Sequence, residues 1–164
     1  MTKLNREELH KVTINLNGKD VSGLAEPRML LSDFLRQVID SNSVHVGCEH
    51  GVCGACTIQL DGRAVRSCLT FAVQADGCSI DTAAGLADEE GELNQLQKAF
   101  RKHHALQCGY CTPGILMSVT DFLGRNPDPT EDEVKDMLSG HICRCTGYVG
   151  MVRAVMDVVE NKNG

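Results

Sequence analysis

Hydrophobic and polar positions alternate along the first half of the chain and recur at helical spacing along the second half. The alternation at residues 11–16 is typical of a half-buried β-strand. Two dipeptides that favour tight hairpin turns, Asn17-Gly18 and Asp61-Gly62, join such segments in pairs. The strands predicted by these patterns are residues 11–16, 20–24, 57–60, 63–66 and 79–82.

Helical periodicity appears once between the two hairpins and then dominates the rest of the chain. Residues 30–39 carry apolar side chains at i, i+3 and i+4, which predicts a helix. Glycines and acidic residues at 83–91 indicate a linker. Pro113 suits a first helical turn, Gly124 indicates a helix end, and Thr130 with Glu133 forms a capping box. The later helices are predicted at residues 93–104, 113–123, 134–138 and 149–159.

This change of pattern predicts an α+β protein of two domains, with a boundary near residue 85. Hairpin, helix, cysteine loop, hairpin and closing strand suggest, partly by analogy, the β-grasp layout of plant-type ferredoxins. The second domain is expected to be a four-helix bundle. We therefore expect residues 1–9 to form a tail, residues 10–85 the sheet domain and residues 86–164 the helical domain.

Composition argues against several classes of function. The chain has 164 residues and a net charge of -6, with no basic stripe that would meet nucleic-acid phosphates. No segment approaches the ~18 apolar residues that span a bilayer, and the polar N-terminus does not resemble a secretory signal. Nine cysteines in such a chain indicate metal or redox chemistry rather than disulfides. We expect a cytoplasmic protein.

The first cysteine cluster lies in a glycine-rich stretch, GCEHGVCGAC, at residues 47–56. Its C-x4-C-x2-C spacing, with a fourth cysteine after eleven intervening residues, is that of a plant-type [2Fe–2S] site. Glycines at 47, 51 and 54 would let the loop curl around a cluster with its amides directed at sulfur. The predicted ligands are Cys48, Cys53, Cys56 and Cys68.

A second set combines a C-x2-C pair with a C-x-C pair, and its four members are Cys108, Cys111, Cys143 and Cys145. The thirty-one residues between the pairs hold two predicted helices, and an antiparallel bundle can bring the helix ends together. C-x2-C also fits zinc or a redox dithiol, whereas C-x-C is cramped for structural zinc. Spacing alone leaves zinc and iron–sulfur about equally open here. Cys78 stands outside both sets and is interpreted as a small hydrophobic residue.

The runs GCEHGVCGAC and QCGYCTPG…CRCTGY together resemble the iron–sulfur small subunit of the xanthine oxidase family of molybdenum hydroxylases. The resemblance covers nearly all of residues 11–160, in order. It implies that the first cysteine set binds a distal [2Fe–2S] cluster, toward the FAD of a medium subunit. The second set would bind a proximal [2Fe–2S] cluster beside the molybdopterin of a large subunit.

The same resemblance implies finer points. Gln107 and Cys145 would contact the pterin, which would be the cytosine dinucleotide form, and the complex would be a dimer of heterotrimers. One position departs from the family, which usually has Asn where this chain has His141, and the change affects local hydrogen bonding around the cluster. The histidines expected to be non-ligands, mostly in loops or on the surface, are His45, His50, His103, His104 and His141.

The function implied is an electron-transfer subunit that relays electrons singly from molybdopterin through both clusters to FAD. The chain itself would contain no substrate-transforming site, since that chemistry belongs to cofactors in other subunits. Two alternatives stay open at this point. One is a free-standing two-cluster ferredoxin, and the other is a zinc-stabilised interaction or redox-regulatory protein. The substrate of a complex is not readable from this chain.

Overall fold

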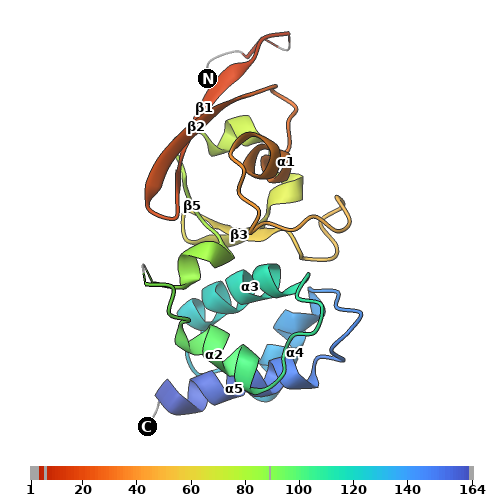
Figure 1. Ribbon diagram of the computed structural model, residues 1–164. Helices are drawn as coiled ribbons and strands as arrows, with labels where there is room; N and C mark the ends of the chain where they lie inside the picture. The colour runs from red at the N-terminus through yellow and green to blue at the C-terminus, as the bar shows by residue number, and fades with distance from the viewer. Residues whose placement is uncertain (1–3, 6, 89, 163–164) are drawn as a thin grey trace.

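The computed structural model describes residues 4–5, 7–88 and 90–162. A sheet half and a helical half lie end to end, with the first strand at one end and the last helix at the other (Figure 1). The expected tail at residues 1–9 falls partly outside the described residues, and its described part is an exposed segment before the first strand. Among the described helices, none has the length and hydropathy to cross a membrane.

The sheet half contains the five predicted strands, with ends shifted by at most one residue. They are β1 (His10–Leu16), β2 (Lys19–Ala25), β3 (Thr57–Leu60), β4 (Arg63–Arg66) and β5 (Ser79–Asp81). Their order in the sheet is β2-β1-β5-β3-β4, with β1 parallel to β5 and the other neighbours antiparallel. Both hairpins turn at Asn-Gly or Asp-Gly pairs with positive φ, which matches the strand twist and confirms the predicted turns.

The helix predicted at residues 30–39 is present, but its second turn is wider than an α-helix. A short α1 (Leu31–Asp33) continues into a π-helical turn, η1 (Phe34–Val38). The amide of Ile39 donates to the carbonyl of Phe34, five residues earlier. Leu31, Phe34 and Leu35 are fully buried against the sheet. Apolar spacing predicts the buried face but not the wide turn, because both turn types bury these positions.

Three short 3-10 turns complete the sheet half and lead into the linker: η2 (Ser67–Leu69), η3 (Ala72–Ala75) and η4 (Ala83–Leu86). None was predicted, because segments of three or four residues are too short to show a period. The turn η2 carries Cys68 and therefore positions the fourth cysteine of the first set.

The helical half contains the four predicted helices: α2 (Gln95–Lys102), α3 (Thr112–Arg125), α4 (Glu131–Ser139) and α5 (Val149–Lys162). The predicted capping box is confirmed, since the Thr130 hydroxyl accepts from the amide of Glu133 and the Glu133 carboxylate accepts from the amide of Thr130. The prediction that α3 ends at Gly124 is wrong by one residue. The helix reaches Arg125 and stops before Asn126-Pro127, where proline restricts the preceding residue.

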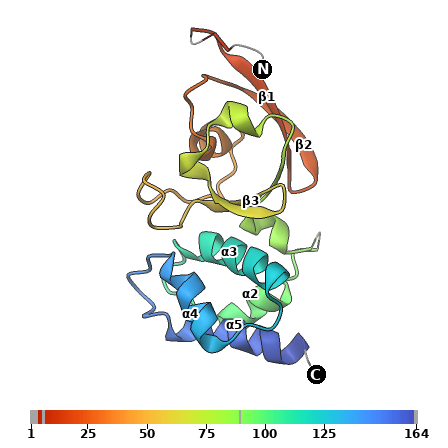
Figure 2. The same ribbon diagram turned by 180° about the vertical axis from the view of Figure 1, so that it is seen from behind.

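Each half has its own aliphatic core, with Phe34 at the centre of one and Phe100 in the other. The halves meet where α3 packs across β3, and Figure 2 shows this helix directly beside the strand. Gly114 makes the close approach possible. A Cβ added there would lie 2.2 Å from the carbonyl oxygen of Gly54, in the first cysteine loop. The helical half therefore rests directly on the cysteine loop of the sheet half.

Candidate iron–sulfur centres and the contacts between them

The first cysteine loop connects η1 to β3 and reverses direction through residues with positive φ, including Gly51 and Gly54. Gly51 also needs to be small, because an added Cβ would lie 2.3 Å from the Leu69 side chain. The four thiols form two adjacent pairs, Cys48 with Cys53 and Cys56 with Cys68. The first pair is half-buried and the second is buried. The structure thus brings together all four predicted members of the first set.

Backbone amides of the loop point at the sulfur of Cys48. The amides of Cys53 and His50 each lie 3.4 Å from this sulfur. These hydrogen bonds, from Cys53 first and His50 second, lower the pKa of the Cys48 thiol to about 6. The thiolate, which is the form that binds metal, is therefore favoured at neutral pH.

The inner pair of the first site has the opposite electrostatic character. Burial, followed by the neighbouring Cys56 thiol, raises the pKa of Cys68 to about 11. The Cys68 thiol therefore resists losing its proton unless a cation compensates the charge. A metal centre supplies that compensation, so the buried pair suits a pair of metal ligands.

The second set is assembled at the ends of helices. Cys108 and Cys111 immediately precede α3, while Cys143 and Cys145 lie in the loop between α4 and α5. The sulfurs of Cys108 and Cys145 are 3.5 Å apart, and both residues are exposed. Cys111 and Cys143 form the deeper pair. The bundle thus brings the C-x2-C and C-x-C pairs together, as their spacing predicts.

Burial and hydrogen bonds also shift the pKa values of thiols in the second set. Burial raises the pKa of Cys111 to about 12. Burial likewise acts to raise the pKa of Cys143, but hydrogen bonds from Thr146, Cys145 and Cys111 together outweigh it and lower that pKa. The Thr146 hydroxyl lies 3.2 Å from the Cys143 sulfur. Each set therefore contains one thiol whose anion the chain stabilises and one buried thiol whose anion needs a metal.

The paired arrangement fits a two-iron cluster. A structural zinc ion requires four donors around one centre. A [2Fe–2S] cluster is instead held by two cysteines on each of its two irons. Each set contains two adjacent pairs of thiols, which is the arrangement that a [2Fe–2S] cluster requires.

His141 lies in the loop between α4 and α5, in keeping with the expectation that the histidines lie mostly in loops or on the surface, but it is not at the surface. Its side chain is buried, with 3% of its surface exposed, and its Nε2 lies 2.7 Å from the hydroxyl of Ser118. The other edge of the ring lies against Gly54, where an added Cβ would sit 2.3 Å from Nδ1. Burial, together with the charge of Arg66, lowers the pKa of His141 to about 4, so the ring is neutral.

Backbone and side-chain hydrogen bonds tie the segment 140–143 to the first cysteine loop. The amide of Ile142 donates to the carbonyl of Cys53 at 3.0 Å. The guanidinium of Arg66 donates to the carbonyl of Gly140 at 2.7 Å and to the hydroxyl of Thr57. The two cysteine sites are therefore in direct contact. Sequence analysis missed this contact, since the segments are far apart along the chain and carry no shared pattern.

The residues predicted to meet the pterin lie on one face. Gln107 and Cys145 are both exposed, and the thiol of Cys145 lies beside that of Cys108, the residue after Gln107. Three large apolar side chains within a few residues of them along the chain are also exposed, namely Leu106, Ile142 and Val149. Exposed apolar side chains next to a candidate site favour a protein interface there.

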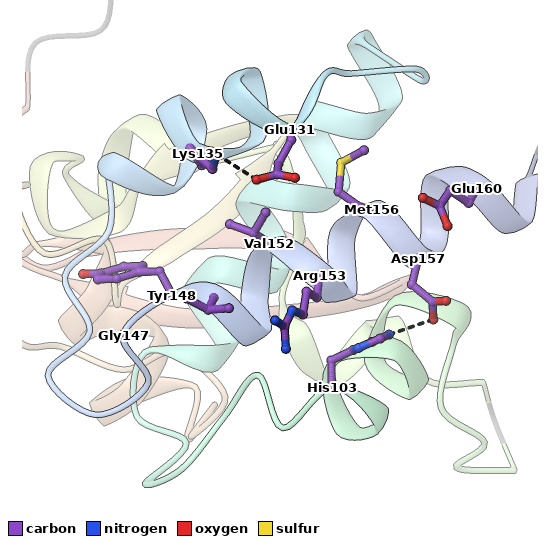
Figure 3. A pocket seen from close by; sticks show the side chains of 11 residues that line it. His103, Glu131, Lys135, Gly147, Tyr148, Val152, Arg153, Met156, Asp157 and Glu160 are labelled. Carbon is purple, nitrogen blue, oxygen red and sulfur yellow. Dashed lines mark ion pairs between the residues drawn. The ribbon is translucent and has the colours of Figure 1, made fainter.

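A separate cavity of about 690 Å³ lies on the helical half (Figure 3). Val152 and Met156 contribute apolar surface, and ion pairs flank it, Lys135 with Glu131 at 2.7 Å and His103 with Asp157 at 3.2 Å. None of the cysteines lines the cavity, so it is not part of either candidate centre.

Comparison with known proteins identifies both halves. A family model described as "2Fe-2S iron-sulfur cluster binding domain" matches residues 14–84, and one described as "[2Fe-2S] binding domain" matches residues 82–156. The chain is 50% identical over 167 residues to the nicotine 6-hydroxylase small subunit of Paenarthrobacter nicotinovorans, covering 100% of both chains. It is 46% identical to the caffeine dehydrogenase subunit gamma of Pseudomonas sp. (strain CBB1), covering 91% of this chain and 90% of that one.

Solved structures are equally similar. A chain of quinoline 2-oxidoreductase from Pseudomonas putida 86 superposes with a TM-score of 0.90 at 50% identity, covering 94% of this chain and 96% of that one. The aldehyde oxidoreductase from Desulfovibrio gigas superposes with a TM-score of 0.86 at 42% identity. There the match covers 94% of this chain but 17% of the other. In that enzyme, the two halves described above are part of a longer chain.

Proposed function

This chain belongs to the iron–sulfur small subunits of the molybdenum hydroxylases, and we propose that it carries electrons between the cofactors of two partner subunits. The observation that supports this role most directly is the joining of two four-cysteine sites by the hydrogen bond from Ile142 to Cys53. Each cluster, when bound, would accept and release one electron at a time. The chain would supply ligands and electrostatic environment rather than a substrate-transforming site.

The ligand assignment follows the two sets of paired thiols. The distal cluster would be held by Cys48, Cys53, Cys56 and Cys68, and the proximal cluster by Cys108, Cys111, Cys143 and Cys145. Reduction adds negative charge to a site that four thiolates already make anionic. Amides on the Cys48 sulfur and the Thr146 hydroxyl on the Cys143 sulfur favour that added charge.

The proximal site is assigned to the interface with the large, molybdopterin-containing subunit. Cys108 and Cys145 are exposed there, and so are the apolar residues Leu106, Ile142 and Val149, which lie close to them along the chain. Covering this face would remove apolar surface from water and place Gln107 and Cys145 against the cofactor. We assign the pterin contacts to these two residues, with the pterin in its cytosine dinucleotide form.

The distal site is assigned to the interface with the medium, FAD-containing subunit. Val52 and Leu69 are 60% and 63% exposed, and Leu69 lies against Gly51 in the cysteine loop. Phe71, three residues after Cys68, is also exposed. A partner docked on this surface would approach Cys48 and exclude water from the loop.

Other parts of the proposal concern the whole complex. We assign it a dimer of heterotrimers in the cytoplasm, where a reducing environment keeps nine cysteines free. The names of relatives include nicotine, caffeine and quinoline, which supports an N-heteroaromatic substrate for the large subunit. Within the chain, we place the domain boundary near residue 85, between the two cores.

Metal and sulfide analysis tests the proposal. The purified chain should contain iron and acid-labile sulfide in equal amounts, and should co-purify with the large and medium subunits when all three are expressed. Zinc without labile sulfide would refute it in favour of a zinc-stabilised protein. Two clusters in a monomer that binds neither subunit would instead identify a free ferredoxin.

A further inference from the structure

Tyr110 belongs to the second cysteine set by sequence but contacts the first cysteine loop. Its ring stacks on that of His45, with centroids 4.7 Å apart and planes inclined by 22°. Its hydroxyl donates to the carbonyl of Val46 at 2.7 Å. Its own carbonyl lies 2.8 Å from Nδ1 of His45, which donates when that nitrogen carries the proton. Three contacts thus attach Tyr110 to the segment just before Cys48.

Gly47 brings the Tyr110 ring close to a ligand sulfur. A Cβ added at this glycine would lie 3.1 Å from the sulfur of Cys53 and 3.9 Å from Cε1 of Tyr110. The ring and the sulfur therefore flank a position that has no side chain. The carbonyl of the same cysteine accepts the hydrogen bond from Ile142.

The segment that carries Cys48 and Cys53 is consequently approached from both cysteine pairs of the second set. Tyr110, from the loop that carries Cys108 and Cys111, lies across Gly47 from the Cys53 sulfur, and Ile142, from the loop that carries Cys143, bonds the Cys53 carbonyl. These two contacts lie apart from each other and add to the packing of Gly114 on Gly54, so together they fix the orientation of the second site as well as its distance.

Core packing does not account for the placement of Tyr110. Its side chain is 49% exposed and belongs to neither hydrophobic core. Its described stacking and hydrogen-bond contacts are to residues 45 and 46, in the other half of the molecule. The side chain therefore acts on the relation between the two halves rather than on the stability of either.

We propose that Tyr110, stacked on His45, is a positioning residue that fixes the geometry between the two cluster sites and so sets the rate of electron transfer between them. In that transfer one electron leaves one site and enters the other, and no bond or proton is exchanged. The inference rests on the proposed function, since it requires both sites to hold clusters.

The test uses the full-length chain purified with its iron, in three variants. Tyr110→Leu removes the stack and the hydroxyl, and Tyr110→Phe removes the hydroxyl alone. Phe122→Leu is the matched control, because it trims an aromatic side chain packed against the helical core. Iron and sulfide are counted first, and the magnetic coupling between the two reduced clusters is then measured by electron paramagnetic resonance. Rapid partial reduction gives the intercluster rate, and thermal unfolding gives stability.

We expect Tyr110→Leu to keep its iron, to weaken the coupling and to slow intercluster transfer several-fold. Tyr110→Phe should show a smaller change in the same direction. Phe122→Leu should lower the unfolding temperature and leave the coupling unchanged.

A fully loaded Tyr110→Leu chain with wild-type coupling and rate would overturn the inference, even if its unfolding temperature fell. If Tyr110→Leu fails to fold, wild-type coupling in both Tyr110→Phe and His45→Leu would overturn it. A wild-type chain without labile sulfide would refute the proposed function instead, so the two failures are distinguishable.

Discussion

The backbone amide of Ile142 donates a hydrogen bond of 3.0 Å to the backbone carbonyl of Cys53. Cys53 is a proposed ligand of the distal cluster, and Ile142 precedes Cys143, a proposed ligand of the proximal cluster. One hydrogen bond therefore joins the backbones that carry the two centres. Because both partners are backbone groups, the bond depends on how closely the two halves dock rather than on either side chain.

The close packing of the two halves is tested by a substitution at Gly114. In Gly114→Ala, the new Cβ would lie 2.2 Å from the carbonyl oxygen of Gly54, so the halves must separate locally. We expect a loss of about 1–3 kcal/mol in the free energy of unfolding, typical of overpacking. Denaturant titration measures this free energy of unfolding. Gly124→Ala, in the same helix with open space around it, should instead stabilise the chain by about 0.5–1 kcal/mol. Equal stabilities of the two variants would contradict the close contact.

Ligand assignment is tested by cysteine replacement. Cys48→Ser should lose the distal cluster and Cys145→Ser the proximal one, so each variant should retain half of the iron and one of two paramagnetic signals. Cys78→Ser is the matched control, because Cys78 contacts the carbonyl of Gln74 and belongs to neither set. Iron analysis and electron paramagnetic resonance spectra of the reduced chain show which cluster each variant has lost. Loss of iron from Cys78→Ser, or full iron in Cys145→Ser, would refute the assignment.

The Thr146 hydroxyl should tune the proximal potential. It lies 3.2 Å from the Cys143 sulfur, and removing it in Thr146→Val withdraws a hydrogen bond that favours the reduced, more negative cluster. If the hydrogen bond stabilises the reduced cluster over the oxidised one by about 1 kcal/mol, its loss shifts the one-electron potential by about 40 mV in the negative direction. Redox titration measures the shift. Thr120→Val removes a hydroxyl that bonds the Leu116 carbonyl within α3, and its potentials should match the wild type.

His141 should be a structural part of the interface. His141→Ala would leave a gap between Gly54 and Ser118, and we expect it to cost about 2–4 kcal/mol of unfolding free energy, as other large-to-small core changes do. Ser118→Ala removes only the hydroxyl partner and should cost about 1 kcal/mol. Denaturant titration of both variants measures the difference. A cost for His141→Ala no larger than that for Ser118→Ala would show that the ring does not fill the contact.

Thiol reactivity in the metal-free chain should follow the pKa values. Amide hydrogen bonds lower the pKa of Cys48 to about 6, so its alkylation rate should rise through that pH and level off near pH 7. Burial raises the pKa of Cys68 to about 11 and that of Cys111 to about 12, so these thiols should stay unmodified at neutral pH. Mass spectrometry after brief alkylation at several pH values gives the order in which the thiols react. Alkylation of Cys48 only above pH 8 would contradict it.

Local features of the molecule could be predicted from the sequence. The Asn17-Gly18 and Asp61-Gly62 turns adopt positive φ as those residue pairs favour, and strand and helix patterns recovered the elements within a few residues. Both cysteine sets are also brought together as their spacing predicts, because each depends on a tight loop or a helix end.

What the sequence could not show depends on contacts between segments distant in the chain. The burial of His141 follows from its packing against Gly54 and Ser118, which no periodicity encodes. The contact of Tyr110 with His45 crosses from one half to the other in the same way. A weak signal existed for Gly114, since a glycine in the first turn of a helix is unfavourable unless close packing requires it.

The burial of the inner thiols places an order on the biogenesis of the protein. Cys56 and Cys68 are buried in the core of the sheet half, and Cys111 is buried in the core of the helical half. Each half therefore encloses the inner thiols of its own site by its own packing. A cluster has to bind all four thiols of its site, so we expect it to enter before the core of that half closes. Cys108 and Cys145 stay exposed, where a partner subunit can cover them.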